Sequence, residues 1–328
     1  MALNIKGLFT TEAIVRRLLK AAKISTPVMD LIYINRPQLG LPVVGSDEIK
    51  NVVRAMPVIR RGGASISVAG ETGATVFYEP LSIRPNVMVV GAALNNLKML
   101  GTSGLEAWAN SKTETLRQIC RKTAEAEAAV SLSGKFSWPV QLENGTFEDW
   151  DIDFGDVLTI DMANFKMWDA ADVKITHIFD LLDGMEEQIQ DKGYGGTIEI
   201  WAGKKAYSTL LGICEDVKTT AKMKVEVTDK GIIIGGFQVK RRNERNYNPK
   251  SKEMVPVVAD KAIKMVATDA GHMMPYCALD DLDANLQPLP FFVKPIPNSD
   301  PSGWKLVAES KPFPCPNVDG ICDAVVLA

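Results

Sequence analysis

The sequence predicts an α+β fold with two long helices, several β-hairpins and one compact mixed region along a chain of 328 residues. Apolar residues recur at helical spacing near residues 103–130 and 175–189, and this periodicity predicts amphipathic helices. Other stretches alternate apolar and polar residues between glycines and prolines, which predicts strands joined by turns. Helices segregated from antiparallel hairpins along the chain are typical of the α+β class.

The composition is that of a soluble globular protein, with 46% hydrophobic and 23% charged residues. A chain of this length buries roughly three quarters of its unfolded surface, enough for a large core. It has no run of about 18 apolar residues, so no transmembrane helix is expected. Arg16 and Arg17 interrupt the N-terminal apolar stretch, so no signal peptide is expected either.

Charge and cysteine spacing disfavour two further classes. The net charge of −3 and the pI of about 5.6 argue against nucleic-acid binding as the main function. One dense basic stretch is expected to be a solvated loop or a subunit contact: Lys240, Arg241, Arg242, Arg245, Lys250 and Lys252. The five cysteines form no C-x-x-C pair, which favours a reducing cytoplasm over a zinc site or disulfides: Cys120, Cys214, Cys277, Cys315 and Cys322.

Residues 1–56 are expected to form an N-terminal arm. Thr10 or Thr11 is placed to cap a short helix with one apolar stripe. Three prolines then interrupt the chain: Pro27, Pro37 and Pro42. The rest of the arm should therefore be extended and find its partners elsewhere.

Residues 57–90 predict a long two-stranded flap. Ile66 and Val68 alternate with small residues, and after a turn at 70–73 a second run continues to Ile83. An isolated hairpin is only marginally stable in water. The flap therefore needs a surface to lie on, on this chain or on a neighbour.

From Ser103 the pattern is helical. Ser103 and Glu106 fit a capping box, and the helix should run about 25 residues to Val130, with Gly134 placed to end it. A hairpin should follow, with a type I′ turn at Asn144-Gly145. Its first strand contains Pro139, which places it at a sheet edge.

The second long helix should end before Gly193. Residues 196–285 then read as a compact α/β region with a short helix near 203–213. The tail, 303–328, predicts two strands around a proline-rich link.

No pattern nominates a catalytic or cofactor-binding residue. His177 is expected to be a partly packed helix residue. His272 could approach a nucleophile, but the sequence contains no G-x-S-x-G nucleophile elbow. A Ser-His-Asp or Cys-His site stays open in principle, because its members need not be adjacent in sequence. The glycines at 193–196 follow a helix and precede a strand, the reverse of a dinucleotide-binding loop, so a turn is expected.

The acidic residues do not form a convincing metal site. Asp149, Asp151 and Asp153 match three positions of a calcium loop, but Ile160 stands where the loop needs glutamate. Their alternation with apolar residues explains them as the solvent face of a strand. Two carboxylate pairs are expected on the surface: Glu186–Glu187 and Asp280–Asp281. No metal, no cofactor and no enzymatic activity are therefore expected.

Three stretches, in this order, resemble the capsid protein E family, the phage lambda-like major capsid proteins with the Hong Kong 97-type fold. Pro57–Gly63, with the run from Phe77 to Val87, resembles the flap called the E-loop. Gly134–Phe136, leading into Trp150–Phe154, resembles the hairpin after the spine helix. The end of the chain, from Ala308, resembles the C-terminal strand pair.

The resemblance implies a division of the chain by role in a shell. Its segments would be an N-terminal arm (1–56), the E-loop and its flanks (57–100), a peripheral domain with the spine helix (101–195), an axial domain (196–285) and a return to the peripheral domain (286–328). The flap would lie across an adjacent subunit, and the arm would clasp another.

The resemblance also implies partners and a location. The chain would form hexamers and pentamers of an icosahedral phage shell around double-stranded DNA, without sequence-specific binding and without a membrane. Scaffold, portal and decoration proteins are possible partners. The protein would belong to the virion and assemble in the cytoplasm of a bacterial host.

Two alternatives stay open from sequence. An encapsulin-like bacterial nanocompartment shell would share the architecture but enclose a protein cargo. A cytoplasmic α/β enzyme would instead present an ordered pocket with convergent polar groups.

Overall fold

The computed structural model describes residues 5–45, 77–99, 101–215 and 224–328. The chain divides into two compact units, each built from three separate segments. The first contains residues 1–43, 79–131 and 273–315, and the second contains residues 44–78, 132–272 and 316–328. These boundaries differ from those of the five predicted segments, which concern roles in a shell.

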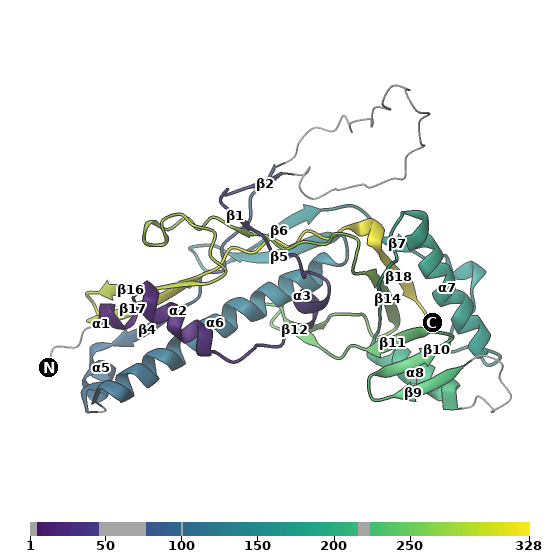
Figure 1. Cartoon of the computed structure of the whole chain (residues 1–328), viewed down its shortest axis with the longest axis horizontal. Helices are drawn as coiled ribbons and strands as arrows, with labels where there is room; N and C mark the ends of the chain where they lie inside the picture. The colour runs from purple at the N-terminus through teal and green to yellow at the C-terminus, as the bar shows by residue number, and fades with distance from the viewer. Residues whose placement is uncertain (1–4, 46–76, 100, 216–223) are drawn as a thin grey trace, which may run out of the picture. The chain divides into compact units, whose positions relative to one another are not determined.

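The longest helix of the first unit is α6, Gly101–Ser131, with 31 residues (Figure 1). It begins two residues before Ser103, so the predicted capping box lies inside the helix and that prediction was wrong. The short helix α5, Gly91–Lys98, ends just before α6. Gly134 follows α6 in a left-handed conformation (φ 76°), as the sequence predicted for the end of this helix.

A three-stranded antiparallel sheet packs on α6 within this unit. Its order is β16 (Phe292–Asn298), β17 (Gly303–Glu309) and β4 (Asn86–Val90). Val89, Leu306 and Ala308 from the sheet share a hydrophobic cluster with Leu116 and Cys120 of α6. Because β4 belongs to this sheet, the stretch 86–90 is not part of a free flap, contrary to the prediction.

The N-terminal segment also lies within the first unit. Helices α1 (Ile5–Leu8) and α2 (Thr11–Lys20) precede α3 (Pro27–Leu31), and Thr10 caps α2 as predicted. Strand β1 (Gln38–Leu39) pairs in parallel with β15 (Tyr276–Cys277). The short helix η2 (Leu282–Ala284) follows β15 in sequence.

The segment from Pro27 onward is therefore not an extended arm that must find its partners elsewhere. Met29 and Tyr33 are fully buried against this chain's own residues. Pro27 starts α3 instead of extending the chain, because its fixed φ suits the first turn of a helix.

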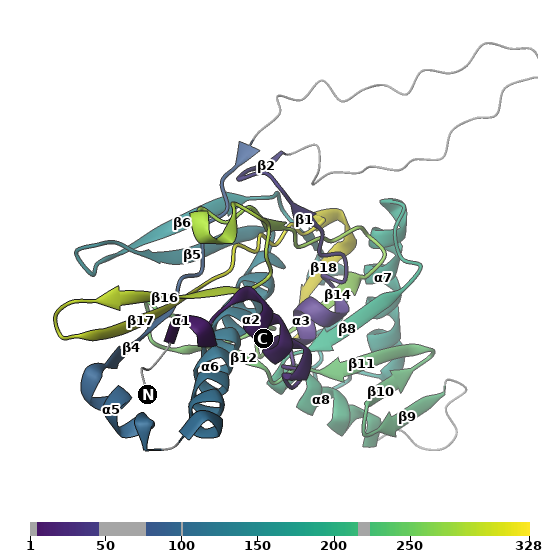
Figure 2. The ribbon, with the colours of Figure 1, turned by 60° about the vertical axis from the view of Figure 1, so that its left-hand side comes forward.

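The second unit is built on a seven-stranded mixed sheet (Figure 2). Its order is β7 (Leu158–Thr159), β18 (Ile321–Val325), β14 (Ala262–Ala267), β8 (Ile198–Ala202), β11 (Phe237–Arg241), β10 (Gly231–Ile234) and β9 (Val225–Thr228). Helices α7 (Ile175–Asp191) and α8 (Lys204–Glu215) pack their apolar faces into the same core. Both helices, and Gly193 beyond α7, agree with the sequence periodicity.

Smaller elements complete this unit. They are two short helices, η1 (Met162–Asn164) and η3 (Val318–Gly320), and a small hairpin of β12 (Arg245–Tyr247) and β13 (Met254–Pro256). Strand β2 (Val44–Gly45) pairs with β3 (Phe77–Tyr78). This pairing brings together the two ends of the stretch 46–76, so the predicted flap tip lies outside the described residues.

The predicted hairpin after α6 is present as β5 (Lys135–Gln141) and β6 (Phe147–Asp153). Its turn differs from the type I′ prediction. The N–H of Gly145 bonds the carbonyl of Leu142, and Gly145 alone of the turn residues has positive φ (81°). The arrangement is a turn followed by one left-handed glycine. The side-chain oxygen of Asn144 accepts the N–H of Thr146 and stabilises this turn.

Gly134→Ala should lower the free energy of unfolding by about 2 kcal/mol, since it adds a clash to a strained backbone. A Cβ at this position would lie 2.2 Å from the carbonyl oxygen of Gly155. Gly145→Ala is the matched control, because its φ is also positive but nothing lies within 4 Å of an added Cβ. Urea unfolding of both variants should give the smaller loss for Gly145→Ala, about 1 kcal/mol. Equal losses would contradict the role given to the Gly155 contact.

Candidate functional site

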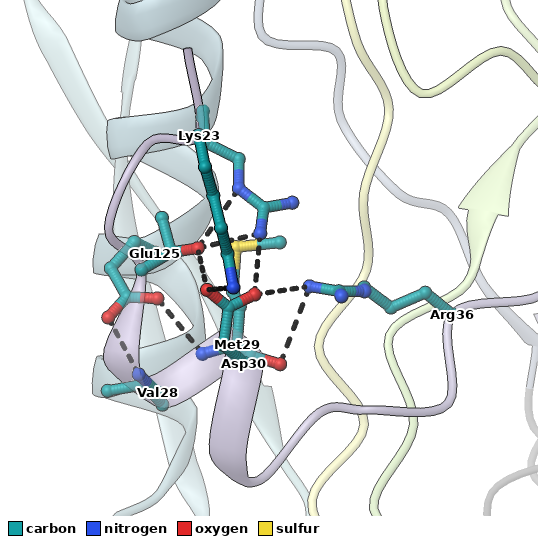
Figure 3. Close-up of polar contacts among 8 residues, drawn as sticks. Lys23, Val28, Met29, Asp30, Arg36 and Glu125 are labelled. Carbon is teal, nitrogen blue, oxygen red and sulfur yellow. Dashed lines mark hydrogen bonds and ion pairs between the residues drawn. The ribbon is translucent and has the colours of Figure 1, made fainter.

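A carboxylate of α6 fixes the N-terminal segment to that helix (Figure 3). Glu125 accepts hydrogen bonds from the backbone N–H groups of Val28 (2.8 Å) and Met29 (3.0 Å). These two donors belong to the first turn of α3, where N–H groups have no partner inside the helix. Glu125 is only 5% exposed, so one buried side chain satisfies two buried donors.

Asp30 of α3 is the centre of a second set of contacts (Figure 3). Its carboxylate lies 2.9 Å from the guanidinium of Arg121 and 3.4 Å from that of Arg36. Arg121 also donates to the hydroxyl of Thr26, which itself donates to Asp30 (3.2 Å). Lys23 stands 3.9 Å away on an exposed side chain, so it adds little.

Tyr33 extends this attachment to the end of α6. Its hydroxyl lies 2.6 Å from that of Ser131, and both side chains are fully buried. Burial raises the pKa of Tyr33, so the phenol stays protonated. We call the contacts of Glu125, Asp30, Arg121 and Tyr33 the α3 clamp.

The acids of α6 have altered electrostatics. Burial raises the pKa of Glu125, although its two backbone hydrogen bonds act in the opposite direction. Desolvation holds the pKa of Glu127 well above its usual value. Neither residue has a substrate-accessible position, because both are at most 5% exposed. Their environment indicates a structural role.

A second group of charges holds the turn at η2. The ammonium of Lys294 lies 2.7 Å from Asp281 and 2.8 Å from Asp283. The Asp281 side chain is 3% exposed, and its oxygen also accepts from the N–H of Asp283. The prediction that Asp280 and Asp281 are both surface residues was therefore wrong for Asp281, which caps a turn. Asp280 is exposed and pairs with the buried Lys311 at 2.9 Å.

The two histidines have structural positions. His177 accepts the N–H of Lys174 at 3.1 Å and thereby caps α7. His272 is 2% exposed, and its ring lies between the carbonyl of Ala267 (3.0 Å) and the N–H of Asn317 (3.0 Å). Because Nδ1 accepts from Asn317, Nε2 carries the proton and donates to Ala267.

The stability of the chain should fall as pH drops from about 6.5 to about 4, partly through His272. Burial lowers its pKa to about 4, whereas the unfolded value is about 6.5. The neutral ring is favoured on folding, so its contribution is complete above pH 6.5 and is lost on acidification, by about 3 kcal/mol. Urea midpoints measured across this range should depend less on pH in His272→Gln. Identical pH profiles would contradict this role.

Some side chains of the acidic and basic stretches pair with other side chains of the second unit. Asp149, Asp151 and Asp153 are exposed on β6, whereas Ile152 between them is buried, as expected for one wet face. Asp149 pairs with Lys250. Lys240 pairs with Glu199 (2.6 Å), and Arg242 stacks on Trp201. The basic stretch is thus partly neutralised, which argues against a phosphate-binding surface.

The cysteines lack the properties of nucleophiles. All five are buried. Burial raises the pKa of Cys120 and of Cys322 to about 12, and that of Cys214 to about 11, so these thiols stay protonated. Among the described residues, no group of three or more potential ligands could hold a metal ion. No helix in the described ranges is long and apolar enough to cross a membrane.

Two grooves flank α2 and α6. The larger, about 560 Å³, is lined by charged side chains that include Arg17 and Glu114, both of which bond neighbouring groups. The smaller, about 360 Å³, is mainly apolar and contains the protonated Cys120. Neither lining includes a histidine or a nucleophile paired with a base, so neither resembles a catalytic pocket.

Sequence reasoning missed the α3 clamp. Its one signal was the pair Glu125 and Glu127 within the otherwise apolar stretch 124–130. Acids in a buried helix face indicate hydrogen-bond partners. The partners of Glu125 lie 96 and 97 residues away in sequence, so no local pattern identifies them.

One family model matches nearly the whole chain, and solved structures share its fold. The family model described as phage major capsid protein E matches residues 10–326. Among solved structures, a prophage capsid protein from E. coli CFT073 is 15% identical, with a TM-score of 0.63 and 100% of each chain covered. The capsid of a native GTA particle is 13% identical, with a TM-score of 0.50, covering 94% of this chain and 92% of that one. At these identities the likeness concerns the fold. No curated protein sequence matches the chain.

Proposed function

The chain belongs to the phage major capsid protein E family, and from this premise we propose that it assembles into the hexamers and pentamers of an icosahedral head. The shell would enclose double-stranded DNA. The observation that carries the proposal is the match of the family model over residues 10–326, nearly the whole chain. We propose a structural role without enzymatic activity, which membership of this family supports.

We propose that the segments divide the work of assembly as the family resemblance implies. Residues 57–100 would form the E-loop and its flanks, with the stretch 57–76 in contact with an adjacent subunit. Residues 101–195 and 286–328 would form the peripheral domain, and residues 196–285 would form the axial domain. Phe9 and Ile14 share the hydrophobic cluster of α6, and residues 27–39 also pack on their own chain. An intersubunit contact of the arm would therefore use side chains that stay exposed on α2, such as Leu19.

Partners and location follow from the same premise. The family makes the chain a virion component, and we propose that it assembles in the cytoplasm of a bacterial host. Scaffold, portal and decoration proteins would act at the surface of the assembled shell or during its assembly. An encapsulin-like compartment would differ by enclosing a protein cargo.

Negative-stain electron microscopy and sedimentation of the full-length protein would test the proposal. Closed shells, tubes or six-membered rings are the expected result. The full chain should also be expressed together with the phage head proteins encoded beside it. Shells that contain packaged DNA in that experiment would favour a head over a cargo compartment. A chain that stays a monomer or dimer in both settings would contradict the proposal.

A further inference from the structure

The outer edge of β4 is an unpaired β-strand edge. Ile83 and Ser310 exchange backbone hydrogen bonds, Ala308 donates to Pro85, and Gly91 donates to Ser302. Antiparallel pairing alternates, so Val87 and Val89 are the β4 residues that bond β17. The N–H and C=O groups of Asn86 and Met88, and the N–H of Val90, therefore point away from the sheet. Within the described residues no partner meets them.

The opposite edge of the same sheet is blocked. By the same alternation, Lys294, Ile296 and Asn298 of β16 bond β17, so Val293, Pro295 and Pro297 point outward. Proline has no N–H to offer, and edge prolines are a common protection against strand addition. The sheet is therefore protected on one side only.

The other long edge strands of the described part are also protected. In the β5–β6 hairpin, Leu142 bonds Thr146 and Phe154 bonds Gly134, so Pro139 is on the outer edge of β5. The outer edge of β6 contains three exposed aspartates: Asp149, Asp151 and Asp153. Strand β9 is shorter than β4, with four residues, and one of them is the charged Glu226, which pairs with Lys224. The remaining edge strands have three residues or fewer.

Strand β4 has none of these protections. Its sequence, Asn-Val-Met-Val-Val, contains no charge and no proline. Met88 is 40% exposed and Val90 is 37% exposed, so the edge also presents apolar side chains. An uncharged, apolar edge without proline is the kind that pairs with another strand.

We propose that β4 pairs antiparallel with β4 of a second copy of this chain, around a twofold axis near Met88, to form a six-stranded sheet across two subunits. This inference rests on the proposed assembly function. A partner strand must itself have an unblocked edge, and β4 is the longest edge strand of the described part that has neither a charge nor a proline. Self-pairing places no like charges opposite each other, whereas self-pairing of β6 would oppose its aspartates. It brings Met88 against Met88 of the other copy, as in any isologous contact.

The first experiment removes the outward donor at the centre of the contact. Met88→Pro should reduce the yield of assembled particles about tenfold or more, because losing the central hydrogen bonds costs at least about 1.4 kcal/mol per contact. Ser137→Pro is the matched control, since Ser137 is an exposed, outward position on the edge of β5 that Pro139 already blocks. Its yield should equal that of wild type. Circular dichroism of the unassembled chains checks that both fold.

The second experiment identifies the occupant even if Met88→Pro does not fold. Assembled Met88→Cys protein, treated with a short bis-maleimide, should give a dimer joined through position 88 of both chains. Ser137→Cys should not, and the native cysteines are buried. Met88→Cys particles that assemble but give no 88–88 link would overturn this pairing and leave the proposed function intact. If Met88→Pro fails to assemble but Met88→Cys particles give no link, the pairing is also overturned, because the edge of β4 then pairs with a different segment. A wild-type chain that forms no assembly would overturn both.

Discussion

Replacing Glu125 with alanine should lower the free energy of unfolding by about 4 kcal/mol. The substitution leaves the N–H groups of Val28 and Met29 buried without an acceptor, and each such group costs about 1–3 kcal/mol. The raised pKa of Glu125 indicates that burial disfavours its charged form, so removing the carboxylate recovers part of that cost. The N–H groups of Val28 and Met29 stay buried in the variant, however, and the loss of their acceptor is the larger effect. Urea unfolding followed by circular dichroism measures the loss.

Glu114→Ala is the matched control on the same helix. Glu114 is 30% exposed and pairs with Arg117 at 2.9 Å, three residues further along α6. Pairs of this kind contribute about 0.5 kcal/mol or less. Glu125→Gln should fall between the two variants, because its amide offers one acceptor where the carboxylate offers two. A loss below 1 kcal/mol (about the size of an ordinary surface effect) in Glu125→Ala would show that α3 does not depend on this carboxylate.

The elements defined by local periodicity were predictable. The apolar spacing of α6 and α7 and the alternation of β5 and β6 depend on residues close in sequence, and these four elements lie where the sequence placed them. The start of α6 was misplaced because a capping box is a local pattern that also occurs inside helices. The family resemblance supplied the fold, which the comparisons confirm.

The contacts of the N-terminal segment were not predictable from local pattern. Three prolines indicated an extended arm, yet Glu125 and Arg121 of α6 hold residues 26–30 from more than 90 positions away. A propensity-based reading cannot detect an acceptor so far along the chain. The same limit applies to Asp281, which looked like a surface acid because its partner Lys294 and its turn are both tertiary features.

Removing residues 47–75 and joining Ser46 to Val76 through two glycines should abolish assembly and leave both units folded. The pairs Val44–Tyr78 and Gly45–Phe77 already hold the two ends together, so the new connection is a four-residue hairpin loop. Shortening the loop from about thirty residues to four reduces the entropic cost of closing it by about 1–2 kcal/mol. The melting temperature should therefore stay the same or rise. A cut that extended to Tyr78 would remove β3 and confuse the two effects.

The loss of assembly would come from the missing side chains of 57–75, which the proposed function assigns to a contact with an adjacent subunit, and of 47–56, the end of the arm. A variant with those residues replaced by a glycine-serine chain of equal length is the matched control, because it keeps the span and removes the side chains. Electron microscopy should find no closed shells from either variant, whereas wild type should form them. Shells from the glycine-serine variant alone would assign the effect to the span. Shells from the deletion variant would contradict the role of this segment, because the paired ends of β2 and β3 cannot supply its contacts.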